Sequence, residues 1–228
     1  MLKLRKAITK RKALWIFPLK FALQIEFLKR REFNLQLEKD CLFAVFNKSV
    51  LSKEYYFDCG DYDLNDFFKN DAVNYAEQLL GRSYYFESKV SKDIVGLFTV
   101  SNASIRVSDL PNNSKRRLGK EIPWVKQGRN YPAVLVGRLG VSLKYKSMGI
   151  GSQMLDFIKA WFVSDKNKTG CRFIIVDAYN NPKSCDFYTR NGFSFLFKNE
   201  LVEKAYNSID TGKQLKTRLM YFDLITLL

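Results

Sequence analysis

The chain has 228 residues, of which 46% are hydrophobic and 15% aromatic, so it is long and apolar enough to form a globular core. It carries 38 lysines and arginines against 23 acidic residues, a formal net charge of +15, and contains no histidine. The missing histidine excludes Ser-His-Asp and Cys-His nucleophilic sites and most zinc sites. The positive charge favours phosphate-rich partners, unless it is simply the solvated surface of a lysine-rich protein.

The first 40 residues differ in character from the rest of the chain. We expect residues 1–40 to be a basic extension, helical or poorly ordered, ahead of a single domain over residues 41–228. The most apolar stretch, ALWIFPLKFALQIEFL, is broken by Pro18, Lys20 and Glu26, so no membrane span is predicted. A basic amphipathic helix lying on a surface fits as well, and a signal peptide is a weaker alternative because a small-residue cleavage site is missing. The four cysteines are far apart and are expected to be reduced, buried thiols of a cytoplasmic protein.

Strand and helix patterns alternate from residue 42 onward. Residues 42–46 read as a short strand. A helix is predicted to begin at Asp61 or Asp63 and to end at Gly81. One buried face of this helix is predicted from helical spacing, and it comprises Leu64, Phe67, Phe68, Ala72, Tyr75 and Leu79. The runs SYYFES and DIVGLFTVS then predict a β-hairpin.

Residues 103–131 read as a long irregular loop punctuated by prolines, asparagines and glycines. Loops of this length are usually functional or mobile. The candidates for contact with RNA are Lys115, Arg116, Arg117, Lys120, Trp124, Lys126 and Arg129. Cations mixed with aromatic rings suit RNA, because the charges attract phosphates and the rings stack on bases. A solvated loop and a site for acidic protein substrates are the open alternatives.

The second half of the chain alternates between strand and helix. Residues 132–141 predict a strand interrupted by Gly137 and Gly140, which indicates a bulge or the close approach of another group. A helix is expected to open near Gly149, and residues 171–179 read as a strand buried on both faces.

The last elements complete the pattern. A short helix is predicted with Pro182 in its first turn and Gly192 at its end. The run TRLMYFDL predicts a strand that closes the sheet. The order of elements therefore predicts an α/β fold with a mixed sheet.

The stretch KYKSMGIGSQML joins the strand at 132–141 to the helix near Gly149. A dinucleotide fingerprint needs a third glycine where Met154 stands, and a P-loop needs a Gly-Lys-Ser/Thr ending, so neither motif is present. The remaining interpretation is a turn at residues 146–152 whose free amides bind a phosphate or pyrophosphate at a helix N-terminus. Lys144 and Lys146 would add positive charge. An ordinary strand-to-helix turn is the alternative.

These motifs together resemble one known family. GRLGVSLKYKSMGIG, followed by Asn181, Tyr188 and the sequence TRNGF, is similar to the GNAT superfamily of N-acetyltransferases. The resemblance runs from about Phe57 to Phe193. It implies an α/β fold with a GNAT-like mixed, mostly antiparallel central sheet, a splay between two parallel strands, and flanking helices. It also implies that acetyl-CoA is the co-substrate.

The resemblance assigns roles residue by residue. Leu139 and Val141 would offer backbone groups to the pantetheine arm. The pyrophosphate would be held by Lys146, Ser147, Met148, Gly149, Ile150, Gly151 and Ser152. Asn181 would bind the cofactor arm, although Asn before proline also forms ordinary turns. Tyr188 would donate a proton to the departing CoA thiolate, and its alternative role is packing on a buried helix face.

The chain departs from the family pattern at two positions. Lys146 replaces the usual Gln or Arg, and Ser147 replaces a common glycine, so we expect weakened rather than abolished binding of the pyrophosphate. No carboxylate stands out as a general base, and Asp177 is the nearest candidate by position. No metal is expected.

A narrower resemblance concerns the acceptor. FDCGDYDLNDFF, the LP and RR pairs, and YPAVLVGRLGV are similar to acetyltransferase toxins of toxin–antitoxin pairs, which acetylate aminoacyl-tRNA. It implies tRNA and a small DNA-binding antitoxin as partners, and a homodimer is left open. The alternatives are an enzyme acting on a protein or small-molecule amine, and a non-catalytic module that binds acetyl-CoA or nucleic acid.

Overall fold

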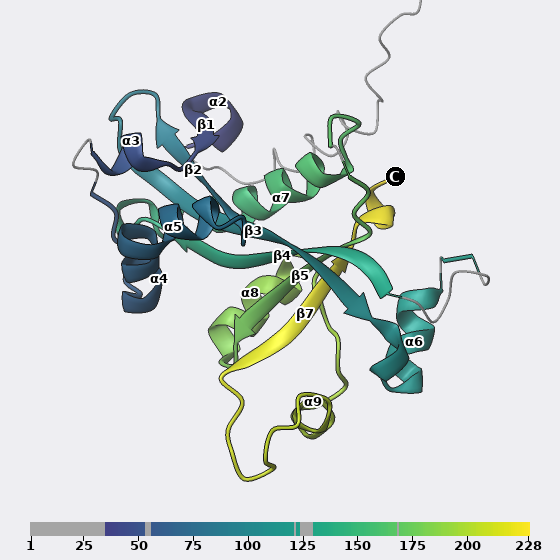
Figure 1. The fold of residues 1–228 in the computed structure, drawn as a ribbon. Coiled ribbons are helices and arrows are strands. Elements are labelled where there is room, and N and C mark those ends of the chain that lie inside the picture. Colours follow the sequence, from purple (N-terminus) through teal and green to yellow (C-terminus); the bar gives the residue numbers. More distant parts are fainter. Residues whose placement is uncertain (1–34, 53–55, 121, 124–129, 168) are drawn as a thin grey trace, which may run out of the picture. The chain divides into compact units, whose positions relative to one another are not determined.

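The computed structural model describes residues 35–52, 56–120, 122–123, 130–167 and 169–228. Its strands are β1 (Cys41–Val45), β2 (Arg82–Ser88), β3 (Ile94–Arg106), β4 (Asn130–Val141), β5 (Phe173–Tyr179), β6 (Ser194–Phe195) and β7 (Thr217–Asp223). They form a seven-stranded sheet in the order β1-β2-β3-β4-β5-β7-β6 (Figure 1). Among the strands that the structure describes, only the β4–β5 pair is parallel, so the predicted α/β fold with a mixed, mostly antiparallel sheet is confirmed.

Helices lie on both faces of this sheet. They are α2 (Leu37–Asp40), α3 (Lys48–Leu51), α4 (Tyr62–Asp66), α5 (Ala72–Glu77), α6 (Asn112–Gly119), α7 (Ile150–Val163), α8 (Pro182–Arg190) and α9 (Glu200–Tyr206). A π-helix, η1 (Phe67–Asp71), joins α4 to α5. Short 3-10 turns are η2 (Val107–Asp109), η4 (Leu143–Tyr145) and η5 (Leu224–Leu227).

The larger part of the core lies between the sheet and helices α7 and α8. The apolar face of α7 is buried here, with Ile150, Met154, Leu155 and Ile158 at most 1% exposed. They pack on alternate residues of the central strands, including Val134, Ile174 and Val176. This alternation is typical of strands buried between layers. We call this side of the sheet the α7 face.

The opposite side, which we call the α4 face, has two smaller cores. One packs α4, η1 and α5 against Ile94 and Leu97 of β3. The other packs η2, α6 and α9 against residues of β4, β5 and β7 that include Ala133, Phe173 and Tyr221. Each central strand therefore contributes to both layers.

The helix predicted over residues 61–81 is present but differs at its centre and end. Asp61 caps it as predicted, because its carboxylate accepts a hydrogen bond of 3.0 Å from the amide of Leu64. Phe67, Phe68 and Ala72 are buried. Leu79, however, is 86% exposed, so the prediction for Leu79 was wrong. The π-helix adds a residue per turn and shifts the helical phase, and the helix ends at Glu77, before Leu79 at φ 59°.

The prediction of an irregular loop over residues 103–131 was wrong for its first part. Strand β3 continues to Arg106 and pairs with β4 as far as Asn130, which makes a long hairpin. The turn η2 and helix α6 follow at its tip. Residue 121 and residues 124–129 lie outside the described residues.

Other parts of the chain agree less closely with the prediction. Strand β7 does not close the sheet, because the two-residue strand β6 pairs on its outer side. All four cysteines are free, but only Cys41 and Cys59 are buried, while Cys171 and Cys185 are half-buried. Residues 1–34 lie outside the described residues, so the domain boundaries stay a prediction. No helix of the described part is long and apolar enough to cross a bilayer.

Candidate functional site

Strands β4 and β5 pair over only three residues and then diverge. Their parallel ladder joins Ala133–Leu135 to Phe173–Ile175. Beyond it, β4 continues along β3 to Val141, and β5 continues along β7 to Tyr179 (Figure 1). Among the described residues, the edge of β4 that faces β5 therefore has no strand partner from Val136 onward. Such an edge can accept an extended ligand as if a strand were being added.

A bulge at Gly137 decides which side chains face this divergence. Thr99 of β3 pairs with Arg138 and Val100 pairs with Val136, so Gly137 is the extra residue that the sequence predicted. The bulge resets the alternation of side chains along β4. As a result, Leu139 and Val141 pack on the α7 face, whereas Arg138 and Gly140 lie on the α4 face.

The sequence also predicted that another group closely approaches the backbone of this strand at a glycine, and this is found at Gly140. A Cβ atom at Gly140 would lie 3.2 Å from the Phe57 ring and 3.4 Å from the Cβ of Cys59. The segment before α4 is therefore pressed directly against the backbone of β4. A side chain at Gly140 would push it away from the divergence.

The turn at residues 146–152, which we call the glycine loop, leads from η4 into α7. Ser147 and Gly149 both have left-handed φ angles, 66° and 72°. Gly149 occupies the N-cap position of α7, and no side chain of the described part caps the helix. Within the described part of the chain, the amides of Met148, Gly149, Ile150 and Gly151 have no hydrogen-bond acceptor. Free amides at a helix N-terminus carry partial positive charge and form a site for an anion.

The two lysines near the loop are already bound to the protein. Lys144 forms an exposed ion pair with Asp93, and this pair raises the pKa of Lys144 and lowers that of Asp93. The ammonium group of Lys146 donates a hydrogen bond of 3.1 Å to the carbonyl of Cys59. Lys144 is thus paired with a carboxylate, whereas Lys146 keeps its positive charge beside the loop. Whether either lysine contacts a phosphate stays a prediction.

Gly151 lies where α7 packs against α8. A Cβ atom at this position would lie 3.1 Å from the ring of Phe187 in α8. The close contact between the two helices therefore favours a glycine at this position, independently of a ligand. Because of this contact, α8 lies directly beside the glycine loop.

Asn181 is the N-cap of α8. Its side-chain oxygen accepts a hydrogen bond of 2.8 Å from the amide of Ser184. The ordinary capping role, which the sequence left open, is therefore present. The side-chain amide nitrogen has no acceptor among the described residues, so this nitrogen is the group that a ligand would use.

Tyr188 lies on the side of α8 that faces the core. Its ring contacts those of Phe187 and Phe193, with centroid distances of 5.0 and 5.5 Å. Among the described residues, its hydroxyl has no hydrogen-bond partner. Burial, with smaller contributions from Asp177 and Tyr179, raises the pKa of Tyr188 to about 12. The phenol therefore holds its proton at neutral pH.

A polar group of residues surrounds the divergence on the α4 face. Asp177 alternates with the buried Val176 and Ala178 and so lies on this side, as does Arg138 across the divergence. Arg138 lies 3.9 Å from a carboxylate oxygen of Asp63 and over the ring of Phe67, 4.9 Å from its centroid.

Two of these polar residues were missed by the sequence analysis. Burial, with a smaller contribution from the carboxylate of Asp61 at the start of α4, raises the pKa of Tyr179 at the end of β5. Arg138 was missed because the bulge, and not the sequence pattern, directs it to this face. The one sequence signal for the direction of the Arg138 side chain was its place directly after Gly137, the residue at the predicted bulge.

The ionisation of Asp177 is expected to make the folding stability depend on pH. Water reaches this side chain, but desolvation by surrounding protein atoms raises its pKa above the ordinary carboxyl value, against the opposing effect of Arg138. The folded state then binds more protons than the unfolded state, so stability falls as pH rises through this window. We expect Asp177→Asn to raise the melting temperature at pH 7 and to leave it unchanged at about pH 3, below the unfolded carboxyl pKa. Calorimetric scans at both pH values test this, and an equal gain at both would contradict it.

The residues expected to contact RNA divide into three groups. Lys115 and Arg116 lie on α6, Lys120 follows its last residue, and no ion pair holds these three cations in the described part of the chain. Arg117 is held by the protein, through hydrogen bonds to the carbonyls of Phe195 and Leu196. The remaining candidates, Trp124, Lys126 and Arg129, lie outside the described residues.

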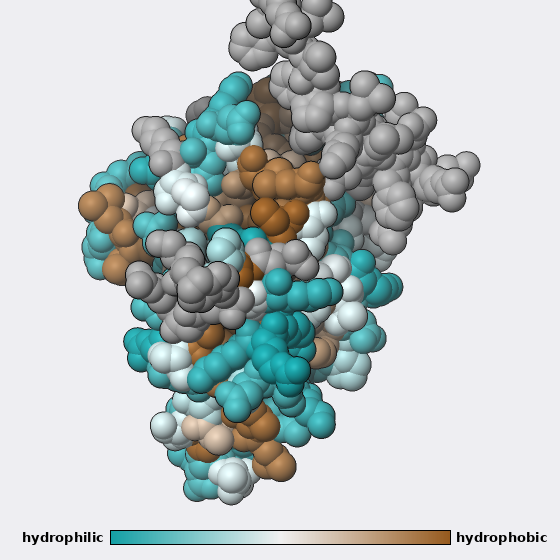
Figure 2. Space-filling view, turned by 90° about the vertical axis from the view of Figure 1, so that its right-hand side faces the viewer, coloured by the Kyte–Doolittle hydropathy of each residue, from teal (hydrophilic) through white to brown (hydrophobic). Residues whose placement is uncertain are grey.

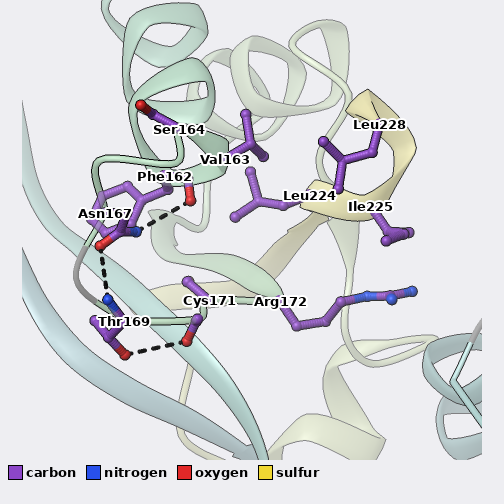
Figure 3. A pocket seen from close by; sticks show the side chains of 11 residues that line it. Phe162, Val163, Ser164, Asn167, Thr169, Cys171, Arg172, Leu224, Ile225 and Leu228 are labelled. Atoms are coloured by element: carbon purple, nitrogen blue, oxygen red, sulfur yellow. Dashed lines mark hydrogen bonds between the residues drawn. The ribbon is translucent and has the colours of Figure 1, made fainter. Parts of the chain in front are cut away.

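A pocket of about 300 Å³ lies at the far end of α7, between Val163, Arg172 and the C-terminal Leu228 (Figure 3). Asn167 closes one side of the pocket, because its side-chain amide donates a hydrogen bond of 3.2 Å to the carbonyl of Phe162. A helix of 14 residues is about 20 Å long, so this pocket is well separated from the glycine loop. It takes no part in the site described above.

Comparisons with known proteins agree on one family. Residues 51–193 match the model described as the Acetyltransferase (GNAT) family. A relative from Mycobacterium tuberculosis, described as a tRNA-acetylating toxin, is 25% identical over 137 residues, which is 60% of this chain and 75% of that protein.

Solved structures match as well. The structure of AtaT complexed with acetyl-methionyl-tRNAfMet superposes with a TM-score of 0.59 at 21% identity, covering 82% of this chain and 97% of that one. The structure of AtaTR bound with AcCoA gives a TM-score of 0.55 at 20% identity, covering 82% and 96%. At this level of identity the structures establish a shared fold.

Proposed function

The chain belongs to the acetyltransferase (GNAT) family, and from this premise we propose that it transfers the acetyl group of acetyl-CoA to the α-amino group of an aminoacyl-tRNA. The observation that carries the proposal is the glycine loop with its uncapped amides, placed beside the diverging strands. A side chain capping α7 would have blocked such a role. None of the described side chains does so.

The chain's own groups fit acetyl-CoA in two places. The amides of Met148, Gly149, Ile150 and Gly151 would hold the pyrophosphate, since they lack acceptors and lie at a helix N-terminus. The β5-facing edge of β4 around Leu139 and Val141 would bind the pantetheine arm as an added strand. The free side-chain nitrogen of Asn181 would donate to the same arm.

The proposed reaction is a direct transfer. The neutral amine attacks the thioester carbonyl carbon, a C–N bond forms and the C–S bond breaks. Backbone N–H groups of β4 would stabilise the negative charge that develops on the carbonyl oxygen. Tyr188 would give its proton to the departing thiolate, since its hydroxyl is protonated and has no partner among the described residues.

The amine must lose a proton in this reaction, and a carboxylate on the α4 face, Asp177, would accept it. Asp177 is close enough to Tyr188 to influence its ionisation. A carboxylate with a raised pKa is better suited to accept a proton at neutral pH than an ordinary one. An α-amino group esterified to tRNA is also less basic than a lysine side chain. We therefore assign to Asp177 the role of accepting the proton that the amine releases. This role assists the reaction but is not required for it.

RNA is the acceptor that the charge of the chain favours. The net charge is +15, and a basic segment at α6 comprises the half-buried Lys115 and the exposed Arg116 and Lys120. The relative from Mycobacterium tuberculosis is described as acting on tRNA. The second candidate is a small-molecule or protein amine, favoured by the acidic residues Asp61 and Asp63 near the divergence. A toxin would also be expected to have a small DNA-binding antitoxin encoded beside it.

Incubation with radiolabelled acetyl-CoA and total charged tRNA tests the proposal. We expect label on the α-amino group of the esterified amino acid, recovered as an N-acetyl amino acid after mild alkaline hydrolysis. Uncharged tRNA is the control and should stay unlabelled. Label on free amines or on proteins, with none on aminoacyl-tRNA, would support the second candidate instead.

A further inference from the structure

The guanidinium of Arg138 is held in place at the strand divergence, on the α4 face. Its Nη1 atom donates a hydrogen bond of 3.1 Å to the carbonyl of Gly137, the bulge residue. The guanidinium carbon lies over the ring of Phe67, 4.9 Å from its centroid, and this contact attracts the cation. The position of the guanidinium is therefore set by the protein before a ligand binds.

These contacts leave hydrogen-bond donors of Arg138 without an acceptor. A guanidinium has five N–H donors, and only one of them is bonded to a described residue. The carboxylate of Asp63 does not use another, because the 3.9 Å from its oxygen to Nε exceeds hydrogen-bond reach. The side chain of Arg138 is 38% exposed. Arg138 is therefore able to donate to an oxygen atom of a ligand in the divergence.

Asp177 and Tyr179 of β5 lie across the divergence from this guanidinium. The ladder between the two strands ends at Leu135 and Ile175, just before these positions, so Arg138 and Asp177 are nearly level. Arg138 opposes the rise in pKa that burial causes at both Asp177 and Tyr179, which means that its charge acts across the divergence. Both residues of β5 are also exposed to water. A ligand between the strands would therefore meet charges of opposite sign.

An amine next to a carbonyl group matches these two charges. The amine donates a hydrogen bond to a carboxylate such as Asp177, and the carbonyl oxygen accepts one from a guanidinium such as Arg138. In an aminoacyl ester a single carbon atom joins the two groups. The amine of a lysine side chain has no carbonyl at that distance and would leave Arg138 without an acceptor. Sites built to hydrogen-bond one substrate group discriminate strongly against substrates that lack it.

We propose that Arg138 selects the acceptor by donating a hydrogen bond to the carbonyl oxygen beside the reacting amine, so that the site takes an aminoacyl ester in preference to an alkyl amine. This rests on the proposed function and names the residue that chooses between its two candidate acceptors. The alternative is a structural role, in which Arg138 only joins β4 to the helix at Asp63 and Phe67. A structural role predicts the same loss for every acceptor.

Two small acceptors that differ in the carbonyl group separate these roles. Leucine methyl ester has the carbonyl, and 3-methylbutylamine is the same amine without the ester group. We measure kcat/KM for both at saturating acetyl-CoA, expressed per neutral amine, in the wild type and in Arg138→Gln. Because the ratio compares two acceptors on one variant, partial unfolding does not change it. Arg138→Met, which keeps apolar packing on Phe67, is the second variant should Arg138→Gln fail to fold.

Arg106→Gln is the matched control. Arg106 also pairs with a carboxylate, that of Asp109 at 3.3 Å, but it lies at the other end of the β3–β4 hairpin, beside η2 and α6. Figure 2 views the molecule from the side on which α6 lies in Figure 1, and hydrophilic residues cover the middle of that face. The control therefore removes one arginine from a polar part of the molecule, away from the divergence.

We expect the wild type to prefer the ester about tenfold, the effect of one hydrogen bond to a charged group, and Arg138→Gln to bring the ratio close to one. Arg106→Gln should keep the wild-type ratio. With charged tRNA, Arg138→Gln should lower kcat/KM about tenfold. The Kd of uncharged tRNA, which has no aminoacyl carbonyl, should not change.

Three results would overturn the proposal. They are a wild-type ratio in Arg138→Gln, a wild type that uses both small amines equally, and unchanged kcat/KM for charged tRNA in Arg138→Gln. If neither small amine reacts, the two tRNA measurements decide, and equal losses in them would show a structural role. A ratio that depends on Arg138, in a protein that does not acetylate charged tRNA, would refute the proposed function alone.

Discussion

Replacing Tyr188 with phenylalanine is expected to lower kcat for acetyl transfer about a hundredfold, the lower end of what a positioned general acid contributes. The reason is that the hydroxyl has no partner in the described part of the chain and keeps its proton to a pKa of about 12. Without it the thiolate must leave unprotonated. The ring still packs on Phe187 and Phe193, so the KM for acetyl-CoA should change by less than about twofold.

Tyr206→Phe is the matched control. This tyrosine packs on Phe197 with a centroid distance of 4.8 Å, in the core of the α4 face, and takes no part in the proposed reaction. Single-turnover rates for the two variants separate chemistry from product release. Equal rates for Tyr188→Phe and the wild type would remove Tyr188 from the mechanism.

Replacing Gly149 with aspartate is expected to raise the Kd for acetyl-CoA at least a hundredfold without destabilising the protein. The backbone at Gly149 has φ 72°, which aspartate and asparagine tolerate better than other residues. A carboxylate at the N-cap would accept the free amides of α7 and repel a pyrophosphate. A charge repulsion of about 4 kcal/mol at 4 Å, in surroundings of intermediate polarity, is ample for this loss. The same charge stabilises the helix, so the melting temperature should not fall.

Gly149→Asn separates charge from shape. The amide side chain is nearly isosteric but neutral, so we expect its Kd to lie between that of the wild type and that of Gly149→Asp. Titration calorimetry for binding and thermal scans for stability are the measurements. Loss of affinity in parallel with loss of stability in both variants would mean that the backbone was distorted, and would contradict this account of the glycine loop.

Local sequence signals predicted the parts of the site that depend on the backbone. Pro182 and Gly192 mark the ends of α8, and Gly149 marks the start of α7, because each residue is suited to one local conformation. Gly137 likewise marks the bulge in β4. The glycine loop and the helix that follows it could therefore be placed from the amino-acid sequence alone.

Side chains whose direction depends on tertiary contacts could not be placed in this way. Lys144 and Lys146 are next to the glycine loop in sequence, yet Asp93 and the carbonyl of Cys59, both distant in sequence, hold them. Arg138 reaches the α4 face only because the bulge shifts the register. Helix α6 was read as a loop because six of its eight residues are polar or charged and its packing side is narrow.

The most direct test of the central claim is the chemical environment of the amides in the glycine loop when coenzyme A binds. In a ¹⁵N–¹H titration of the uniformly labelled protein, we expect the largest shifts at Met148, Gly149, Ile150 and Gly151, and smaller ones along Leu139 to Val141. Pantetheine, which lacks the diphosphate, should shift the β4 residues but not the loop. Binding of coenzyme A with unmoved loop amides would contradict the account.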